Sequence, residues 1–221
     1  MARASYNLKA IVRKVGDSKK LRKQMDIVAR HRLESVKTKM IEEFIDHPVS
    51  REIAAGAGAS NTSGTLTGGY GNLFTFIGFP ANRRPISDIV NLMKRSTYLI
   101  GARSRRLRSR NPNTVSRAYD INYLSEMEID SFGEAKMPWE SGSWIKGIEE
   151  GLSGFGSYMY KSFGEGRSKQ ALQAKKGGRA GGGDQQIRVG SYSPIGGYVS
   201  TIIKNFKRNA RSAVGGHFKV S

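Results

Sequence analysis

The sequence predicts an α+β protein in which a long N-terminal helix packs with a small, mostly antiparallel sheet and further helices. Apolar residues recur at helical spacing near both ends of the chain, while the middle holds short aromatic and β-branched runs bounded by Gly and Pro. We expect a single domain over residues 1–221, with flexible segments at about 54–72 and 175–186 that form extended Gly-rich arms or loops.

The first helix is predicted from about Ser18 to Asp46. Asp17 or Ser18 is a good N-cap. The apolar residues that follow at nearly helical spacing are Leu21, Met25, Val28, Leu33, Val36, Met40 and Phe44. Such a helix would be on the order of 43 Å long at 1.5 Å per residue. His47-Pro48 ends it, because the residue before a proline disfavours helical geometry.

The next segments alternate between flexible and regular structure. Residues 54–72 are almost all Gly, Ala, Ser, Thr and Asn, which suits either a plain linker or an arm that orders against a neighbouring subunit. The aromatic and β-branched run 73–79, closed by Pro80, predicts a buried strand. A helix over 86–94 follows, because its apolar residues share one face.

The second half predicts a strand pair and two more helices. Residues 97–100 and 115–121 are expected to pair across the turn Asn111-Pro112-Asn113. Ser141 or Ser143 begins a helix that extends from Trp144 to Met159. The last helix places Tyr198, Ile202, Ile203 and Phe206 on one side and Lys204, Lys207, Arg208 and Arg211 on the other.

Positive charge dominates the composition. The chain has 37 Lys and Arg against 18 Asp and Glu, a formal net charge of +19, and no Cys. Such a surplus favours polyanions or acidic protein surfaces. No stretch approaches the roughly 20 apolar residues of a membrane span, and no apolar run in residues 1–7 resembles a signal peptide. Since the basic residues are interleaved with Gly and Ser, we expect no membrane partner.

No catalytic, cofactor-binding or metal-binding residues are predicted, so we expect a protein without enzymatic activity. His31, His47 and His217 have no metal-ligand spacing, and His31 is expected on a surface or interface. The Gly clusters match neither a phosphate-binding loop nor a dinucleotide fingerprint. The paired acids Glu126 and Glu128 could share one side of a strand, but no nucleophile or metal partner accompanies them.

Five arginines form the candidate binding site. Arg103, Arg105, Arg106, Arg108 and Arg110 lie within eight residues that contain no acid. We expect these side chains to face DNA or an acidic partner protein, since the guanidinium group fits phosphate and carboxylate. The basic residues of the N-terminal segment are the second choice, and a solvated edge strand protected from aggregation is the alternative. Any contact with DNA would be with the backbone and independent of sequence.

The order of segments resembles structural proteins of tailed bacteriophages, in particular neck and tail-completion proteins that join capsid to tail. The resemblance is carried by the basic first helix, the Thr/Gly-rich stretch 62–68, the run 72–79 with Pro85 after it, and the segments 137–145 and 147–149. It differs from the tail-completion pattern in lacking a basic residue soon after 65–69. Trp139, Trp144, Phe74, Phe76 and Phe79 are expected in core or interface packing.

The resemblance implies a non-enzymatic virion protein of the phage neck or head-tail interface, made in the host cytoplasm. Copies would form a six-fold or twelve-fold ring around the DNA channel, between the portal side and the tail, in contact with other neck, portal or tail proteins. One rival is a free, sequence-independent nucleic-acid-binding protein, such as a nucleoid or ribosome-associated factor. Another is a phage enzyme such as a maturation protease or nuclease.

Overall fold

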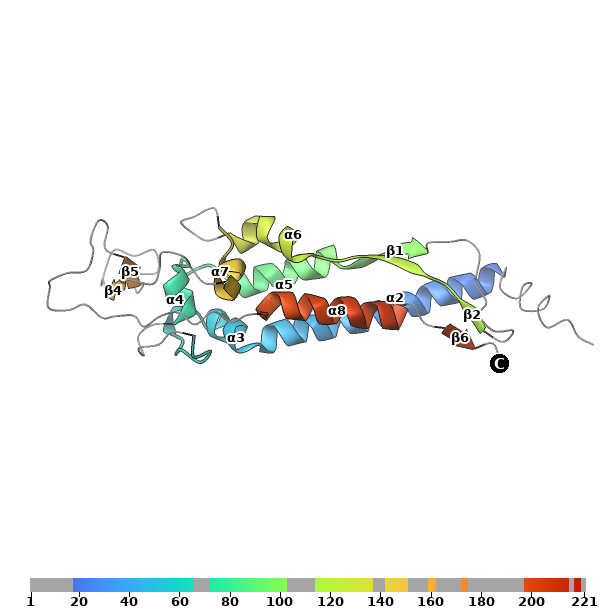
Figure 1. The fold of residues 1–221 in the computed structure, drawn as a ribbon, viewed down its shortest axis with the longest axis horizontal. Helices are drawn as coiled ribbons and strands as arrows, with labels where there is room; N and C mark the ends of the chain where they lie inside the picture. The colour runs from blue at the N-terminus through green and yellow to red at the C-terminus, as the bar shows by residue number, and fades with distance from the viewer. Residues whose placement is uncertain are drawn as a thin grey trace, which may run out of the picture. The chain divides into compact units, whose positions relative to one another are not determined.

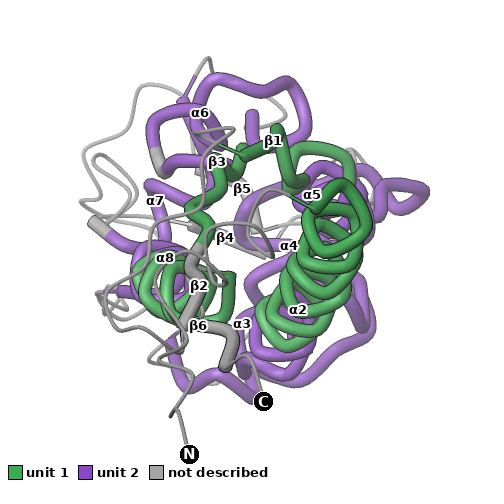
Figure 2. The backbone as a smooth tube through the Cα atoms, turned by 90° about the vertical axis from the view of Figure 1, so that its right-hand side faces the viewer, with its two compact units in different colours: residues 1–40, 95–123, 204–221 green, residues 41–94, 124–203 purple. Residues whose placement is uncertain are grey.

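The computed structural model describes residues 18–65, 72–102, 114–136, 142–150, 159–161, 172–174, 197–214 and 217–219. The fold is α+β and mostly helical: the long N-terminal helix α2 (Lys19–Asp46) packs on the C-terminal helix α8 (Tyr198–Val214) and on a two-stranded antiparallel sheet (Figure 1). The chain divides into two compact units (Figure 2). Unit 1 comprises residues 1–40, 95–123 and 204–221, and unit 2 comprises 41–94 and 124–203.

The two long helices confirm the helical spacing at both ends of the sequence. In unit 1, α2 buries Met25, Ala29, Leu33 and Met40. The buried face of α8 is formed by Tyr198, Val199, Ile202, Ile203, Phe206, Ala210 and Val214. Arg32 of α2 contacts Ala213 near the end of α8, and in unit 2 Phe44 near the end of α2 stacks on Tyr198 at the start of α8. The helices therefore run antiparallel.

The strands of unit 1 form two small antiparallel pairs. β1 (Tyr98–Ala102) pairs with β3 (Tyr119–Asn122), with an irregularity between Leu99 and Gly101. β2 (Thr114–Ser116) pairs instead with β6 (His217–Lys219) near the C-terminus. The predicted strand pair is thus confirmed, but its returning strand is divided at Arg117 and Ala118. The Arg117 side chain lies 3.5 Å from Asp26 of α2.

Unit 2 is built mainly from short helices. After α2 these are α3 (Pro48–Ala54), the 3-10 turn η1 (Gly56–Gly58), α4 (Leu73–Ile77), α5 (Pro85–Ser96, which continues into unit 1), α6 (Glu126–Ser131), the 3-10 turn η2 (Gly133–Ala135) and α7 (Trp144–Glu150). The strands β4 (Met159–Lys161) and β5 (Leu172–Ala174) pair antiparallel. The predicted helix over 86–94 is confirmed as α5.

The predicted strand over 73–79 is wrong, because residues 73–77 form the helix α4. Asn72 and Thr75 make a reciprocal capping box at its start, and Gly78 ends it in the left-handed conformation at φ 77°. Every residue of α4 is buried. A short, fully buried apolar run has no period that separates strand from helix, so the capping residues decide the structure.

Two other secondary-structure predictions need correction. The helix expected from Trp144 to Met159 is described only over α7, and Met159 begins strand β4. Its predicted N-terminus is confirmed, since the Ser143 hydroxyl accepts a hydrogen bond from the Lys146 amide at 3.3 Å. Glu126 and Glu128 lie in helix α6, not in a strand; Ser125 caps that helix and forms a capping box with Glu128.

An aromatic cluster forms the centre of the core in unit 2. Trp144 and Phe79 are fully buried and meet edge to face at 5.8 Å between ring centroids, and Phe74 lies 5.4 Å from Phe79. The Trp144 indole donates a hydrogen bond to the Glu134 carbonyl oxygen at 3.2 Å. Core packing is therefore confirmed for Trp144, Phe74, Phe76 and Phe79. Trp139 lies outside the described residues.

Buried polar groups organise the described part of the Gly-rich segment 54–72. The Glu52 carboxylate, 1% exposed, accepts hydrogen bonds from the amides of Ser63 and Leu73, both at 2.7 Å. The Asn72 side chain donates to the carbonyl oxygens of Ala57 and Ala59. Residues 66–71 and 175–186 lie outside the described residues, so the predicted flexibility of both segments stays a prediction.

Within the described ranges, no helix combines the length and the apolar character needed to cross a membrane.

Candidate polyanion-binding surface

Charge is distributed unequally between the two units. Among the described residues of unit 1 the acids are Asp26, Glu34 and Asp120. The basic residues there are Lys19, Lys20, Arg22, Lys23, Arg30, Arg32, Lys37, Lys39, Arg95, Arg117, Lys204, Lys207, Arg208, Arg211 and Lys219. In the described part of unit 2, acidic residues outnumber basic ones. The positive charge of the protein is therefore concentrated in unit 1.

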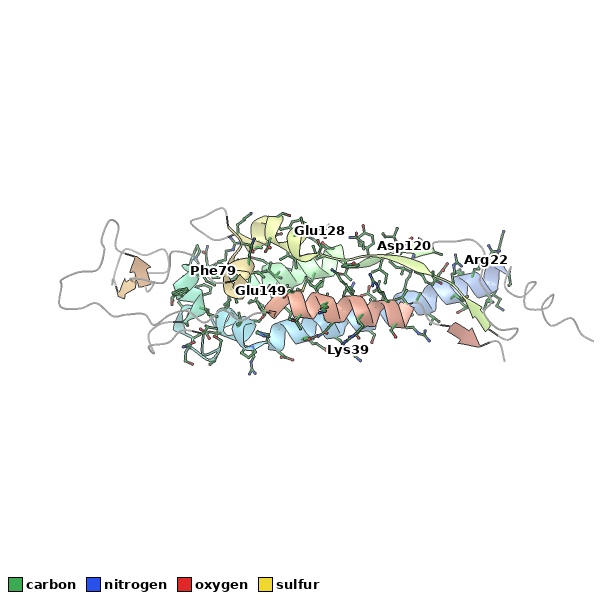
Figure 3. All side chains as sticks on the ribbon, in the orientation of Figure 1. Arg22, Lys39, Phe79, Asp120, Glu128 and Glu149 are labelled. Atoms are coloured by element: carbon green, nitrogen blue, oxygen red, sulfur yellow. The ribbon has the colours of Figure 1, made fainter. Side chains whose placement is uncertain are left out.

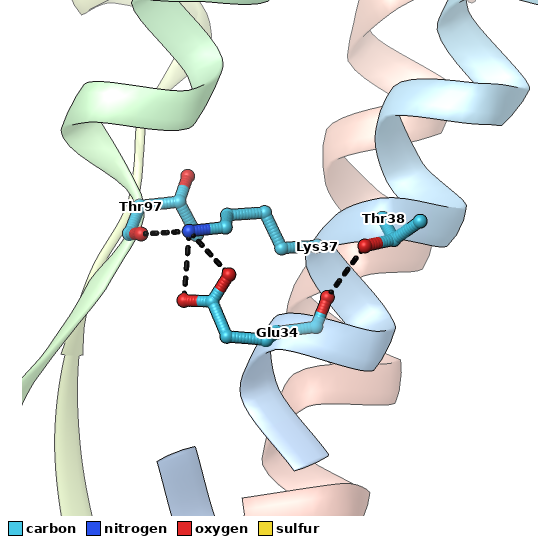
Figure 4. Close-up of polar contacts among 4 residues, drawn as sticks. All are labelled: Glu34, Lys37, Thr38 and Thr97. Atoms are coloured by element: carbon cyan, nitrogen blue, oxygen red, sulfur yellow. Dashed lines mark hydrogen bonds and ion pairs between the residues drawn. The ribbon is translucent and has the colours of Figure 1, made fainter. Parts of the chain in front are cut away.

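Two of the acids in unit 1 are engaged by neighbours inside that unit. Glu34 forms an ion pair with Lys37 at 2.7 Å, and Lys37 also donates to the Thr97 carbonyl oxygen (Figure 4). Asp26 accepts a 2.8 Å hydrogen bond from the Tyr119 hydroxyl. Burial, with the hydrogen bond to Asp26, raises the pKa of Tyr119, so its hydroxyl stays protonated as the donor. Both carboxylates are therefore held by neighbouring side chains of unit 1.

A basic stripe follows the exposed face of α8. It consists of Lys204, Lys207, Arg208 and Arg211, whose spacing of i, i+3, i+4 and i+7 places them on one side of the helix. Lys204, Arg208 and Arg211 are exposed, and within the described ranges no acidic side chain forms an ion pair with them. The opposite face is buried, which fixes the direction in which the stripe points.

Neighbouring side chains position the stripe. The Lys207 ammonium lies 5.2 Å from the centroid of the Tyr123 ring, a cation–π distance, and Tyr123 meets the buried Phe206 edge to face at 6.1 Å. Arg208 donates to the Asn205 side-chain oxygen at 3.4 Å. Arg32 of α2 donates to the Ala213 carbonyl oxygen at 3.3 Å and brings a further positive charge to the C-terminal end of α8. Figure 3 labels Arg22 and Lys39, two further basic residues of α2.

The stripe has the dimensions and chemistry to contact a phosphate backbone. Lys204 and Arg211 are seven residues apart, on the order of 10 Å along the helix. That length covers about three nucleotides of one DNA strand at roughly 3.4 Å each. Exposed lysines and arginines bind phosphate without reading bases, and the same groups would bind carboxylates on an acidic protein. The arrangement therefore supports sequence-independent binding of an anion-rich surface.

The residues predicted as the binding site lie outside the described residues. Arg103, Arg105, Arg106, Arg108 and Arg110 belong to the segment that connects β1 to β2 in unit 1, and their role stays a prediction. The sequence placed the α8 residues correctly on a polar helix face but did not identify them as a site. The available signal was their helical spacing, four basic residues on one face without an acid among them.

The histidines and acid pairs form no metal-binding cluster in the described part of the chain. His31 is exposed on α2, as expected. His47 accepts a hydrogen bond from the Val49 amide at 3.3 Å and caps α3. No group of three or more metal-ligating side chains is found among the described residues.

Comparison with protein-family models, curated proteins and solved structures finds no match to this chain.

Proposed function

We propose that this chain is a non-enzymatic structural protein of a phage neck or head-tail interface. Repeated copies form a ring around the DNA channel and join the capsid or portal side to the tail. The basic surface of unit 1 contacts the DNA backbone or acidic surfaces of other neck, portal or tail proteins. The order of sequence segments that resembles neck and tail-completion proteins supports this assignment.

The α8 stripe is the observation on which the proposal rests most directly. Its three exposed basic residues have no acidic partner among the described residues, although the chain places acids freely in unit 2. Concentrated like charge destabilises a compact unit by self-repulsion. Such an arrangement is favourable once an anionic partner lies against it. In a ring, weak contacts of this kind are multiplied by the number of copies.

The test combines the mass of the assembled protein with the salt dependence of its binding to random duplex DNA. We expect a multi-copy wild-type protein whose DNA affinity falls steeply with salt. Replacing Lys204, Arg208 and Arg211 by Ala should flatten the plot of log K against log salt by about 0.9 for each phosphate contact removed. The matched control replaces Arg51, Arg84 and Lys94, two exposed arginines and one exposed lysine of unit 2, and should leave the slope unchanged.

The rival, a free nucleic-acid-binding protein, gives a different result. It predicts a monomer that binds random DNA with submicromolar affinity near physiological salt, and absence of the protein from purified virions. That combination would contradict the proposed function. An unchanged salt slope in the α8 variant would remove α8 as the DNA-contacting surface.

A further inference from the structure

We propose that the two oppositely charged ends of α2 bind one another in neighbouring copies of the chain. The basic patch, formed by Lys20, Lys23, Ile27 and Arg30, docks on the acidic patch, formed by Glu42, Ile45 and Asp46, of a second copy. This inference rests on the proposed function, because the second copy is taken to be the neighbouring subunit of the ring. It assigns the surfaces through which the subunits associate.

The basic patch has an apolar centre. Ile27 is 39% exposed, so a large aliphatic side chain lies at the surface of the helix among charged residues. Lys23 and Arg30, at i−4 and i+3, lie beside it on the helix surface, and Lys20 is one turn further away. All three are exposed, and no acidic side chain within the described ranges forms an ion pair with them.

The acidic patch repeats this design with the opposite charge. Ile45 is 44% exposed, and Glu42, at i−3, and Asp46 beside it are also exposed. Ile45 also lines a groove in unit 2 of about 750 Å³, whose apolar lining includes Ile53, Phe74 and Val90. An aliphatic side chain from a second copy would find apolar surface there and carboxylates next to it. The charged residues that line the groove, Arg83, Arg84 and Lys94, are all basic, so the neighbour's lysines would lie toward Glu42 and Asp46 and away from them.

The charges of α2 oppose its own helix dipole at both ends. The first turn contains Lys19 and Lys20 and no acid, and the last turn contains Asp46 and no basic residue. A helix favours the reverse arrangement, by about 0.3–1 kcal/mol for each well-placed charge. Two unfavourable charge placements in one helix indicate that these residues contribute to another interaction, because natural sequences depart from local preferences mainly at functional sites. Here each misplaced set of charges is complementary to the other end of the same helix.

Pairing of these patches places different surfaces of two copies in contact. Such a heterologous interface leaves one free patch at each end, so association continues and gives a ring where the rotation between copies closes. An exposed apolar centre within a charged rim is also the usual composition of protein interfaces. The α8 stripe is not used in this contact and remains available to the anionic partner.

Charge-reversal variants test the pairing. Variant X is Glu42→Lys with Asp46→Lys, and variant Y is Lys20→Glu with Lys23→Glu. Light scattering coupled to size-exclusion chromatography should give a single-chain mass for X alone and for Y alone, while the wild type gives a multi-copy mass. A mixture of X and Y should recover the multi-copy mass, because each reversed patch meets its complement. The control, Lys39→Glu with Arg51→Glu, makes the same change of charge as Y at two exposed residues outside both patches and outside the α8 stripe, and should assemble like the wild type.

Thermal unfolding separates loss of the contact from loss of the fold. X and Y should still unfold cooperatively, with a melting temperature no lower than that of the wild type diluted until it is a single chain, because only the stabilisation from assembly is lost. X or Y assembling like the wild type, or a mixture that stays at single-chain mass, would overturn the pairing while leaving the proposed function in place. Complexes that stop at two copies would support the contact and contradict the ring. A wild type that is a single chain at every concentration would contradict both.

Discussion

The His47 imidazole packs against Tyr198 and caps helix α3. Its ring lies 4.5 Å from that of Tyr198 between centroids, and its Nδ1 atom accepts the Val49 amide at the start of α3. Burial lowers the pKa of His47, opposed by the nearby Glu43 carboxylate, which raises it. The neutral form is therefore the one that the fold uses, because a protonated Nδ1 cannot accept the Val49 amide.

This coupling predicts an acid-sensitive contribution to stability. Since the folded-state pKa is lower than the ordinary value of 6.5, the unfolded chain binds more protons in that window. Stability from His47 is then fully present above about pH 6.5 and is lost as the pH falls toward its folded pKa. We expect His47→Asn, which keeps a capping acceptor without a titrating group, to reduce the loss of unfolding free energy between pH 7.5 and 5.5.

The matched control is His31→Gln, because His31 is exposed on α2. Denaturant unfolding at both pH values gives the comparison. A loss in the His47 variant as large as in the wild type would show that the imidazole does not contribute the pH dependence.

At the scale of single elements, the start of α8 depends on a backbone conformation that suits glycine. Gly197 precedes the helix with φ at 84°, and a Cβ added there would lie 2.5 Å from the Thr201 hydroxyl oxygen. Gly197→Ala should therefore lower the unfolding free energy by about 1–2 kcal/mol from the left-handed conformation alone. The steric contact adds to this cost.

A double variant divides the two contributions. Gly197→Ala with Thr201→Ala removes the contact and retains the backbone strain, so it should recover only part of the loss. Gly58→Ala, at a glycine with ordinary φ and open space around it, is the control and should change stability much less. Equal unfolding free energies for Gly197→Ala and Gly58→Ala would contradict the role of the positive φ.

How far an element could be predicted depended on its length. α2 was predicted nearly to its ends and α8 by the residues on its two faces, because several turns of apolar spacing agree with one another. α4 was predicted as a strand, since its five buried residues show no hydrophobic period that separates helix from strand. The capping box that starts the helix depends on the side chains of Asn72 and Thr75 alone, and it was missed. The α8 stripe was visible as spacing, but that α2 and α8 lie together in unit 1 is a property of the fold.

At the scale of the whole molecule, the net charge of +19 lowers the stability of the folded protein through repulsion among like charges. Repulsion among the basic residues of unit 1 falls as salt shortens the Debye length from about 30 Å at 0.01 M to about 8 Å at 0.15 M. We therefore expect the melting temperature to rise across this range of NaCl, by a few degrees if about 1 kcal/mol is recovered. A short duplex DNA or another polyanion should give a similar rise at low salt, because it binds the folded surface.

The variant with Lys204, Arg208 and Arg211 replaced by Ala separates general repulsion from a specific surface. It should melt higher than the wild type at 0.01 M salt, because three like charges are gone, and it should gain less from added DNA. The unit 2 control with Arg51, Arg84 and Lys94 replaced removes the same charge where acids outnumber bases, and should not melt higher at low salt. A melting temperature that falls with salt in the wild type would show that attractive pairs outweigh the repulsion, and would remove the physical reason for an anionic partner.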